Sequence, residues 1–500
     1  METYQVDAGT ALTPADFSRK GDTHLSRLQR FLDALGNGKN GVLDADYIIP
    51  SQLVLGWKTR FSLDGHGHRI CLADGSPTGW GGSALLIVEC TDFEIANLIC
   101  DGNRAKRTPA ENPAHVIEID KCHRWRLRGV QAVNGTCDGF YIFAGSEGNG
   151  TGPGGTVTLA DCPSDWNMED CVALGNFRQG LTITEAQRGA IRGGRYGQTH
   201  GLWDSGNGPC AGLDLEPDHH PTWPSGRIAG IHIEGACFDG NQGPGIVVTN
   251  VDGVRDIRII DCTFDRNAKA AIESTGYNVD IVRPKVRGWN QSDYTNRADA
   301  PPKRGAIDIG AGAGLTRIVD PEFHETQNGA STANPCIYVH GSAAANIAVS
   351  GIRTDGTASV ICMANAPDVH VSRSVVDLNG ATHNDAFTFL GDRAVFEEVT
   401  LLGTYGRAAF FSGKQPRIIN NKLIVRVADK ESHVVNASEA EAPEIRGNIV
   451  EFAKSATGLA FGIGRDAVIV DNKVVNGGRG TFSIRAPARR VSGNLEFEKR

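Results

Sequence analysis

A short pattern, one small residue followed by alternating apolar residues, recurs through the middle of the chain. The small residue is Gly139, Gly180, Gly212, Gly245, Ala271 and Ala306, and the segments that begin there read GFYIF, GLTIT, GLDLE, GIVVT, AIEST and AIDIG. The intervals between them are 41, 32, 33, 26 and 35 residues. Periods of roughly 20 to 50 residues indicate a stacked array in which each unit buries its apolar face only against its neighbours.

The composition supports an all-β solenoid. The chain has 62 glycines and only 3 methionines, as expected for many short strands joined by tight turns. The pattern weakens after Ala306 but persists, and no linker or change of composition marks a further domain. Later copies are CIYVH, AFTFL, AAFFS, GLAFG and GTFSI, which begin at Cys336, Ala386, Ala408, Gly458 and Gly480. Residues 56–500 are therefore predicted to be one β-helix domain.

Residues 1–55 are predicted to form an N-terminal cap with a short amphipathic helix. Thr23 can cap this helix, and Gly36 with the residues after it can end it. The apolar stripe is Leu25, Leu28, Phe31, Leu32 and Leu35. We expect the helix to cover the open end of the solenoid, which would otherwise present unpaired strand edges.

The repeat and three short segments resemble a known superfamily. The segments are DFSRKGD (16–22), the stretch 47–70 and DGNR (101–104). They resemble the opening of β-helical phage tailspike glycan depolymerases and mannuronan C-5 epimerases, within the pectin-lyase-like right-handed parallel β-helix superfamily. The resemblance implies a single-stranded right-handed parallel β-helix. Tailspikes of this kind are commonly homotrimers packed along the helix axis, and we carry that over as an expectation.

Charge and hydropathy exclude two classes of partner. The 50 basic and 58 acidic residues give a net charge of −8, with no basic run that could follow a phosphate backbone, so no nucleic acid is expected. No apolar stretch reaches the roughly 18 residues of a membrane helix. The start METYQVDAGTALTPADF lacks the regions of a signal peptide. A cytoplasmic, virion-associated or secreted protein with its signal removed all remain open.

The twelve cysteines are predicted to be reduced thiols in the core rather than disulfides. Cys171, Cys237 and Cys262 each precede an asparagine by four or five residues, as if they occupied one repeated inward position. No CxxC pair and no Cys/His ligand spacing occurs, so no metal site is expected. No cofactor is expected either, with Ca²⁺ considered only if the protein is a lyase.

The segment GLDLE places two acids among inward leucines. Alternate strand residues point to opposite faces, so Leu213 and Leu215 face the core and Asp214 and Glu216 face outward onto an exposed trough. The aligned segments then give two outward rows. The first is Tyr141, Thr182, Asp214, Val247, Glu273 and Asp308, and the second is Phe143, Thr184, Glu216, Thr249 and Thr275.

This carboxylate pair is the candidate catalytic site. Alternate α-carbons of a strand lie about 6.6 Å apart, which is compatible with the roughly 5 to 9.5 Å between glycosidase carboxyl groups. We assign Glu216 as general acid and Asp214 as base or nucleophile, and the exchanged assignment is equally open. Asp218 could orient a water or replace either partner. The candidate substrate-binding residues are Tyr141, Phe143, Thr182, Glu185, Trp203, Asp204, His219, Trp223 and Glu273.

Simpler interpretations stand beside these assignments. Outward acids on a solenoid usually form a solvated face, and His219 with His220 in a polar loop are more often simply exposed. Glu185 and Arg188 are typical of a surface ion pair. The cluster of acids with nearby tryptophans and histidines nevertheless favours a functional site at residues 214–220.

The leading hypothesis is a carbohydrate-active enzyme, a glycoside hydrolase-type depolymerase acting on a polysaccharide or oligosaccharide. The first alternative is a polysaccharide lyase or uronate C-5 epimerase. Mannuronan epimerases carry a DPH motif on a comparable strand, whereas here Asp214 is followed by leucine and Glu216. Scarce lysine and arginine on the face also disfavour a uronate substrate unless calcium mediates binding. The second alternative is a non-catalytic glycan-binding or structural β-helix.

Overall fold

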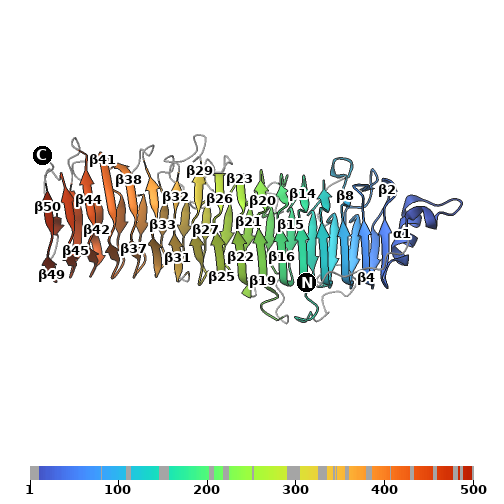
Figure 1. The fold of residues 1–500 in the computed structure, drawn as a ribbon, viewed down its shortest axis with the longest axis horizontal. Coiled ribbons are helices and arrows are strands. Elements are labelled where there is room, and N and C mark those ends of the chain that lie inside the picture. Colours follow the sequence, from blue (N-terminus) through green and yellow to red (C-terminus); the bar gives the residue numbers. More distant parts are fainter. Residues whose placement is uncertain are drawn as a thin grey trace. The chain divides into compact units, whose positions relative to one another are not determined.

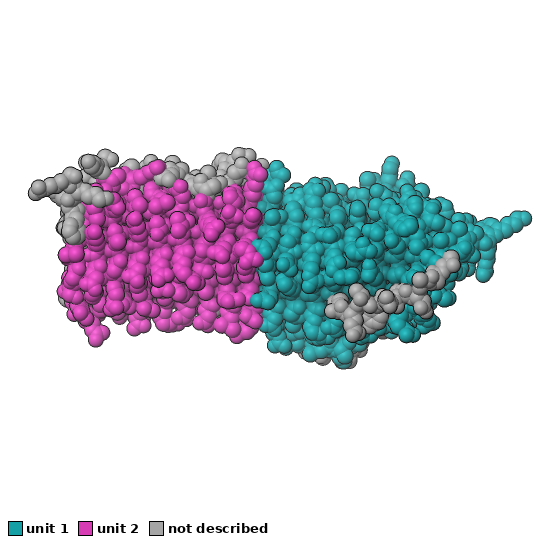
Figure 2. Space-filling view, in the orientation of Figure 1, with its two compact units in different colours: residues 1–268 teal, residues 269–500 magenta. Residues whose placement is uncertain are grey.

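The computed structural model divides the chain into two compact units, residues 1–268 and 269–500 (Figure 2). The residues that it describes are 11–497 apart from 80, 108–113, 146–156, 202–207, 218–223, 250–252, 290–304, 325–334, 342–343, 345, 355–359, 379–385, 406, 428–432, 454–458, 477–481 and 485–487. Each unit is described separately below.

Unit 1 contains three parallel sheets, here named A, B and C, and successive strands of the chain enter them in rotation (Figure 1). Sheet A contains β1 (Lys39–Val42), β4 (Thr59–Asp64), β7 (Thr91–Ala96), β10 (His123–Arg128), β13 (Ser164–Glu169), β16 (Ala186–Arg192), β19 (Ile228–Glu234) and β22 (Arg255–Ile260). Sheet B contains β2 (Tyr47–Ile49), β5 (Arg69–Leu72), β8 (Ile99–Asp101), β11 (Gln131–Val133), β14 (Val172–Leu174), β17 (Arg195–Gly197), β20 (Cys237–Asp239) and β23 (Thr263–Asn267). Sheet C contains β3 (Leu53–Gly56), β6 (Leu85–Val88), β9 (Ile117–Asp120), β12 (Phe140–Phe143), β15 (Leu181–Ile183), β18 (Leu213–Leu215) and β21 (Ile246–Val248).

Unit 2 repeats this arrangement with its own strands. Sheet A contains β25 (Tyr277–Val282), β28 (Arg317–Val319), β31 (Ile347–Ser350), β34 (Val369–Ser372), β37 (Val395–Glu397), β40 (Arg417–Ile419), β43 (Glu444–Arg446), β46 (Val468–Val470) and β49 (Arg490–Ser492). Sheet B contains β26 (Lys285–Trp289), β29 (Glu322–His324), β32 (Arg353–Thr354), β35 (Val375–Asp377), β38 (Thr400–Tyr405), β41 (Lys422–Val427), β44 (Ile449–Phe452), β47 (Lys473–Val475) and β50 (Leu495–Phe497). Sheet C contains β24 (Ile272–Ser274), β27 (Ile307–Ile309), β30 (Ile337–Val339), β33 (Cys362–Ala364), β36 (Phe387–Phe389), β39 (Ala409–Phe411), β42 (His433–Glu441), β45 (Leu459–Arg465) and β48 (Phe482–Ile484).

The predicted fold class, an all-β right-handed single-stranded parallel β-helix with a short N-terminal capping helix, is confirmed. Each turn of the chain, called a coil below, adds one strand to each sheet, and the strands of a sheet pair in register. The aligned segments match this register, because Leu181 pairs with Leu213 and Leu213 pairs with Ile246. Leu213 and Leu215 are both fully buried, so the leucines face the core as predicted.

The capping helix α1 (His24–Ala34) also forms as predicted. The Thr23 side chain accepts a hydrogen bond from the Ser26 backbone, and Leu28, Phe31 and Leu32 are buried. The helix packs on β2 and β3, and Figure 1 shows it at the start of the β-helix. Two short 3₁₀ helices, η1 (Pro14–Phe17) and η2 (Arg104–Lys106), complete the helical elements of the described residues. None of the described helices is long and apolar enough to cross a membrane.

Aromatic rings stack from coil to coil inside sheet A of unit 1. The ring centroids of Phe61 and Phe93 lie 5.0 Å apart, and those of Trp125 and Trp166 lie 5.3 Å apart. Gly189, in the strand that follows, is the register partner of Trp166, and a Cβ at Gly189 would lie 2.0 Å from the indole ring. A side chain at this position would therefore have to displace the stack.

None of the twelve cysteines forms a disulfide, in agreement with the prediction of reduced thiols. Cys171 and Cys262 are fully buried, but Cys237 is half-buried. The prediction that the three share one inward position is wrong for Cys237. It pairs with Thr263, the residue after Cys262, and therefore occupies the next position in the register.

Candidate functional site

The candidate site lies on the outer face of sheet C in unit 1. Residues next to one another in the register form two outward rows on this face. The first row is Val54, Leu86, Glu118, Tyr141, Thr182, Asp214 and Val247. The second row is Gly56, Val88, Asp120 and Phe143, followed by Thr184, Glu216 and Thr249 just after their strands. The structure thus places the predicted positions from Tyr141 to Thr249 in the expected order.

Two strands of this face carry a pair of acids. β18 with the residue after it contributes Asp214 and Glu216, and β9 contributes Glu118 and Asp120. The Glu118 and Asp120 pair was missed from the sequence, although IEID has the same alternation as LDLE. In this coil Val116 occupies the position that a small residue fills in the aligned segments, so the repeat pattern does not include it.

Most of the face is buried. Asp214 is 2% exposed, Tyr141 is 8% exposed and Phe143 is 2% exposed, whereas Glu216 is exposed. The expectation of an exposed trough is therefore wrong for Asp214 and for both rings. Tyr141 and Phe143 instead pack in an apolar cluster with Leu86 and Val88, which leaves little ring surface for a sugar.

The centre of the polar network is Asp138, in the turn before β12, which sequence reasoning missed. Its carboxylate is fully buried and accepts two hydrogen bonds from the Arg178 guanidinium, at 2.8 and 2.7 Å. It also accepts hydrogen bonds from the Thr182 hydroxyl at 2.8 Å and the Gln179 backbone N–H at 3.1 Å. Burial opposes ionisation of Asp138, but Arg178 and His115 outweigh it and hold the pKa of this carboxyl well below its ordinary value.

His115, which lies two residues before β9, completes this network. Its Nδ1 lies 3.1 Å from Asp138 Oδ2, and its ring stacks on Tyr141 with centroids 4.0 Å apart. Burial lowers the pKa of His115, but Cys137 and Asp138 outweigh it and raise this pKa to about 10. The cluster therefore holds two cationic groups, His115 and Arg178, around one buried carboxylate.

Gln179 connects this network to Asp214. Its side-chain amide donates to Asp214 Oδ2 at 3.1 Å, while Asp214 Oδ1 is buried without a hydrogen-bond partner among the described residues. Burial raises the pKa of Asp214 well above its ordinary value, and Glu216 adds to the rise. Arg178 and the bond from Gln179 oppose it. The environment of Asp214 therefore favours the protonated form of its carboxyl group.

The second acid pair is also shifted toward its neutral form. Burial raises the pKa of Glu118, against the charge of His115. Burial likewise raises the pKa of Asp120 to about 7. The environment of this face thus favours the neutral form of Asp214, Glu118 and Asp120 and the ionised form of Asp138.

The other predicted site residues lie in different settings. Glu185 is fully buried, with its Oε1 3.5 Å from Nη1 of the equally buried Arg227. The prediction of a surface ion pair with Arg188 is wrong, because Arg188 instead pairs with Asp165. Glu273 lies in unit 2, where it pairs with Asp308 in the register of sheet C. Five of the predicted residues lie outside the described residues: Trp203, Asp204, Asp218, His219 and Trp223.

One group of potential metal ligands occurs in the described part of the chain. Ligand atoms of His115, Cys137 and Asp138 lie within 4.8 Å of one another. The set does not suit Ca²⁺, which takes oxygen ligands. Both Asp138 oxygens already accept hydrogen bonds from Arg178, so a cation would have to compete with a guanidinium. The group therefore fits a metal poorly.

Three parallel sheets that the chain enters in rotation make this a right-handed parallel β-helix, which is the fold that the resemblance noted from the sequence implies. Two solved structures with this fold are the bacteriophage phi29 gene product 12 N-terminal fragment and the pre-mature gene product 12. The fragment has a TM-score of 0.50 at 11% identity, over 96% of this chain and 93% of its own. The pre-mature form has a TM-score of 0.51 at 12% identity, over 97% and 72%.

The Azotobacter vinelandii mannuronan C-5 epimerase AlgE6 A-module is also similar, with a TM-score of 0.35 at 14% identity over 97% of this chain and 98% of its own. No protein-family model matches the chain, and the comparison with curated proteins finds no relative. The similarity to the two gene product 12 structures, at 11% and 12% identity, shows the fold alone.

Proposed function

We propose that the protein is a carbohydrate-active enzyme, a glycoside hydrolase-type depolymerase that cleaves a polysaccharide or oligosaccharide at Asp214 and Glu216. The observation that carries the proposal is the contrast within this pair. Asp214 is buried with a raised pKa, whereas Glu216, two residues on, is exposed. Two carboxyl groups in such different environments suit the acid and base roles of glycoside hydrolysis.

The contrast favours the exchanged assignment of roles. Asp214 holds the proton that would pass to the leaving glycosidic oxygen, and the exposed Glu216 carboxylate would act as base or nucleophile. Because Glu216 is exposed and adjoins Asp214, the substrate would reach the pair from the Glu216 side. Gln179 positions Asp214 through its hydrogen bond to Oδ2. The trimer implied by the tailspike resemblance stays a prediction that analytical ultracentrifugation can test.

A lyase or epimerase is less well supported by the site. These reactions need a group that neutralises the uronate carboxylate. The candidates are His115 and Arg178, but both already face the Asp138 carboxylate. The site therefore has no uncommitted cation among these residues for a second carboxylate.

The test is a product assay on a panel of bacterial and plant glycans with purified protein. Hydrolysis gives new reducing ends without ultraviolet absorbance, elimination gives an absorbing unsaturated sugar, and a binder gives neither. Asp214→Asn and Glu216→Gln should each lower the rate by about 100-fold or more. Glu234→Gln, on an exposed position of β19, is the matched control and should retain activity. Near-normal rates in both site variants, with unchanged circular dichroism, would remove the proposal.

A further inference from the structure

The outer face of sheet C in unit 2 is more open than the face in unit 1. Its first outward row contains Tyr338, Met363, Thr388 and Phe410, which are neighbours in the register. Its second row contains His340, Asn365, Leu390, Ser412 and Ser438, each just beyond a register-matched residue or within β42. Asn365 is exposed, Leu390 is 43% exposed, and Tyr338, Phe410 and Ser412 are partly exposed.

One end of this face carries an aromatic ring held in place. The Tyr338 hydroxyl accepts a hydrogen bond from the Asn365 side chain at 3.2 Å. The ring also stacks on His340, with centroids 4.9 Å apart, and His340 Nε2 lies 2.7 Å from Asp308 Oδ1. Asp308 in turn accepts from the Gly305 backbone at 3.1 Å. A partly exposed ring fixed in this way offers an apolar surface at a low cost in side-chain entropy.

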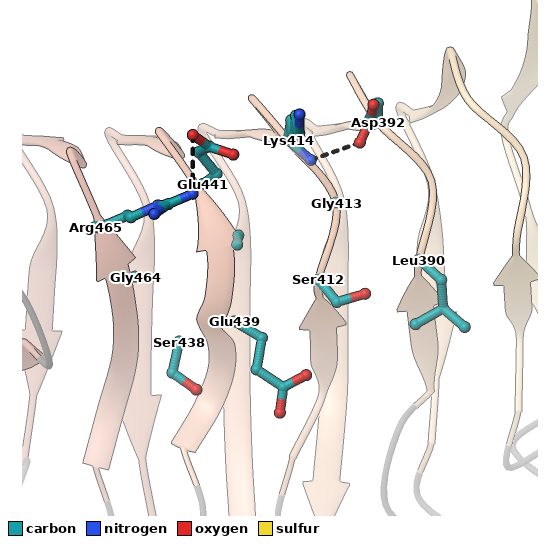
Figure 3. Close-up of a pocket in the computed structure, with 11 residues that line it drawn as sticks. Leu390, Asp392, Ser412, Gly413, Lys414, Ser438, Glu439, Glu441, Gly464 and Arg465 are labelled. Carbon is teal, nitrogen blue, oxygen red and sulfur yellow. Dashed lines mark hydrogen bonds and ion pairs between the residues drawn. The ribbon is translucent and has the colours of Figure 1, made fainter.

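The other end of the face is a polar pocket of about 480 Å³ (Figure 3). Leu390, Ser412, Ser438 and Glu439 line it from consecutive strands of the sheet. It is completed by Asp392 and Lys414, in the turns after β36 and β39, and by Glu441 and Arg465, the last residues of β42 and β45. They are tied by a hydrogen bond from the Lys414 backbone to Asp392 and by an ion pair between Glu441 and Arg465.

The spacing of these groups suits an extended chain. Neighbouring coils lie about 4.8 Å apart, so the four steps from the Tyr338 strand to the Ser438 strand span about 19 Å. Along this path, the coils from Met363 to Phe410 each place an apolar group beside an amide or hydroxyl group. Sugars combine the same two kinds of surface, with apolar C–H faces and a rim of hydroxyls.

The charges on the path favour an uncharged ligand. The Asp308 carboxylate is paired with His340, and Glu441 is paired with Arg465. Glu439 at the pocket is an exposed carboxylate that would repel a polyuronate and can accept hydrogen bonds from hydroxyls. The pocket lining contains three acids, Asp392, Glu439 and Glu441, against two basic residues, Lys414 and Arg465, and Arg407 lies 4.7 Å from the centroid of the Phe410 ring. Because acids outnumber basic residues at the pocket, a neutral chain suits it better than a polyanion.

We propose that unit 2 carries a polysaccharide-binding groove, from Tyr338 to the pocket at Ser438 and Glu439, that holds an uncharged sugar chain across successive coils. The groove uses none of the carboxyl groups assigned to catalysis. Because its ligand contacts are separate from Asp214 and Glu216, the groove can be tested independently of the hydrolase proposal.

The test is binding of the full-length protein to an array of purified bacterial and plant polysaccharides, both neutral and uronate-containing. The wild type should bind at least one neutral polymer. Tyr338→Ala and Glu439→Ala should each weaken that binding about tenfold. Tyr277→Ala removes a tyrosine that is 47% exposed on sheet A of the same unit and should leave binding unchanged. Melting temperatures of all variants check the fold.

Glu234→Gln, on an exposed position of β19 in unit 1, should leave the array signal within about twofold of wild type. The groove is refuted if the wild type binds no neutral polymer, if it binds only uronates, or if Tyr277→Ala weakens binding as much as Tyr338→Ala. Loss of binding in Asp214→Asn with no effect of Tyr338→Ala would place the contact in unit 1 and also overturn the inference.

Discussion

Asp120 offers a direct test of the electrostatics in unit 1. Its side chain is 1% exposed at the end of β9. Burial raises its pKa from 3.8 to about 7, Glu89 and Glu118 add to the rise, and Lys121 and the Gly145 backbone N–H oppose it. The folded protein therefore keeps a proton at Asp120 that the unfolded chain releases between about pH 4 and pH 7.

The sign and size of the effect follow from this difference. The stability contributed by neutral Asp120 is complete below its ordinary pKa and is lost as the pH rises through about 7. From pH 5 to pH 7, two pH units at about 1.4 kcal/mol each give a loss of about 3 kcal/mol. Asp120→Asn stays neutral at every pH, so its stability relative to wild type should rise by about that amount between pH 5 and pH 8.

The assay is thermal unfolding at pH 5 and pH 8, followed by circular dichroism. For domains of about 150–250 residues, 3 kcal/mol corresponds to a relative shift in Tm on the order of 6 °C. Asp256→Asn, on an exposed position of β22, is the matched control and should follow the wild type at both pH values. If the Tm of Asp120→Asn changes between pH 5 and pH 8 by the same amount as that of wild type, the Asp120 carboxyl is already ionised in the folded protein and the reasoning is refuted.

Two further predictions concern buried polar contacts. Arg178→Gln leaves the Asp138 carboxylate without its guanidinium and should lower the free energy of unfolding by about 3 to 5 kcal/mol in urea titrations, whereas Arg188→Gln on an exposed pair should cost less than about 1 kcal/mol. Equal costs would contradict the buried network. Asn448→Ala removes a side chain that donates to Asn472 Oδ1 at 2.9 Å and should cost about 1 to 3 kcal/mol, and an unchanged urea midpoint would contradict this contribution.

The fold could be predicted because each coil of a solenoid repeats the same small and apolar positions, so the sequence shows the period of the fold. Gly180 shows why the small residue recurs, since a Cβ there would lie 2.5 Å from the Gly212 carbonyl oxygen of the next coil. The coils of β9, β33 and β42 were missed because Val116, Ile361 and Val434 occupy that place and still pack. A larger residue is tolerated where the neighbouring backbone leaves room, and the sequence does not show where that is.

The site was predicted only in part. The outward direction of Asp214 follows from the leucines on either side, but its burial depends on what covers the face, which strand alternation does not encode. Asp138 was missed because its partners His115 and Arg178 lie 23 and 40 residues away and meet it only through the stacking of coils. The glycine-rich segment 143–156 and the polar segment 289–305 are also typical of loops that leave a solenoid, and they fall almost wholly outside the described residues.

In unit 2, asparagines at matching positions join one coil to the next. Asn421 bonds Asn448, Asn448 bonds Asn472 and Asn472 bonds Asn494, although these residues are 27, 24 and 22 positions apart. The same asparagine–asparagine hydrogen bond forms between coils of different length, so these coils are structurally equivalent units. A duplicated coil inserted between Asn448 and Asn472 would have a matching asparagine on both sides, so the sheets of unit 2 could be extended by about 4.8 Å per insertion without redesigning the core.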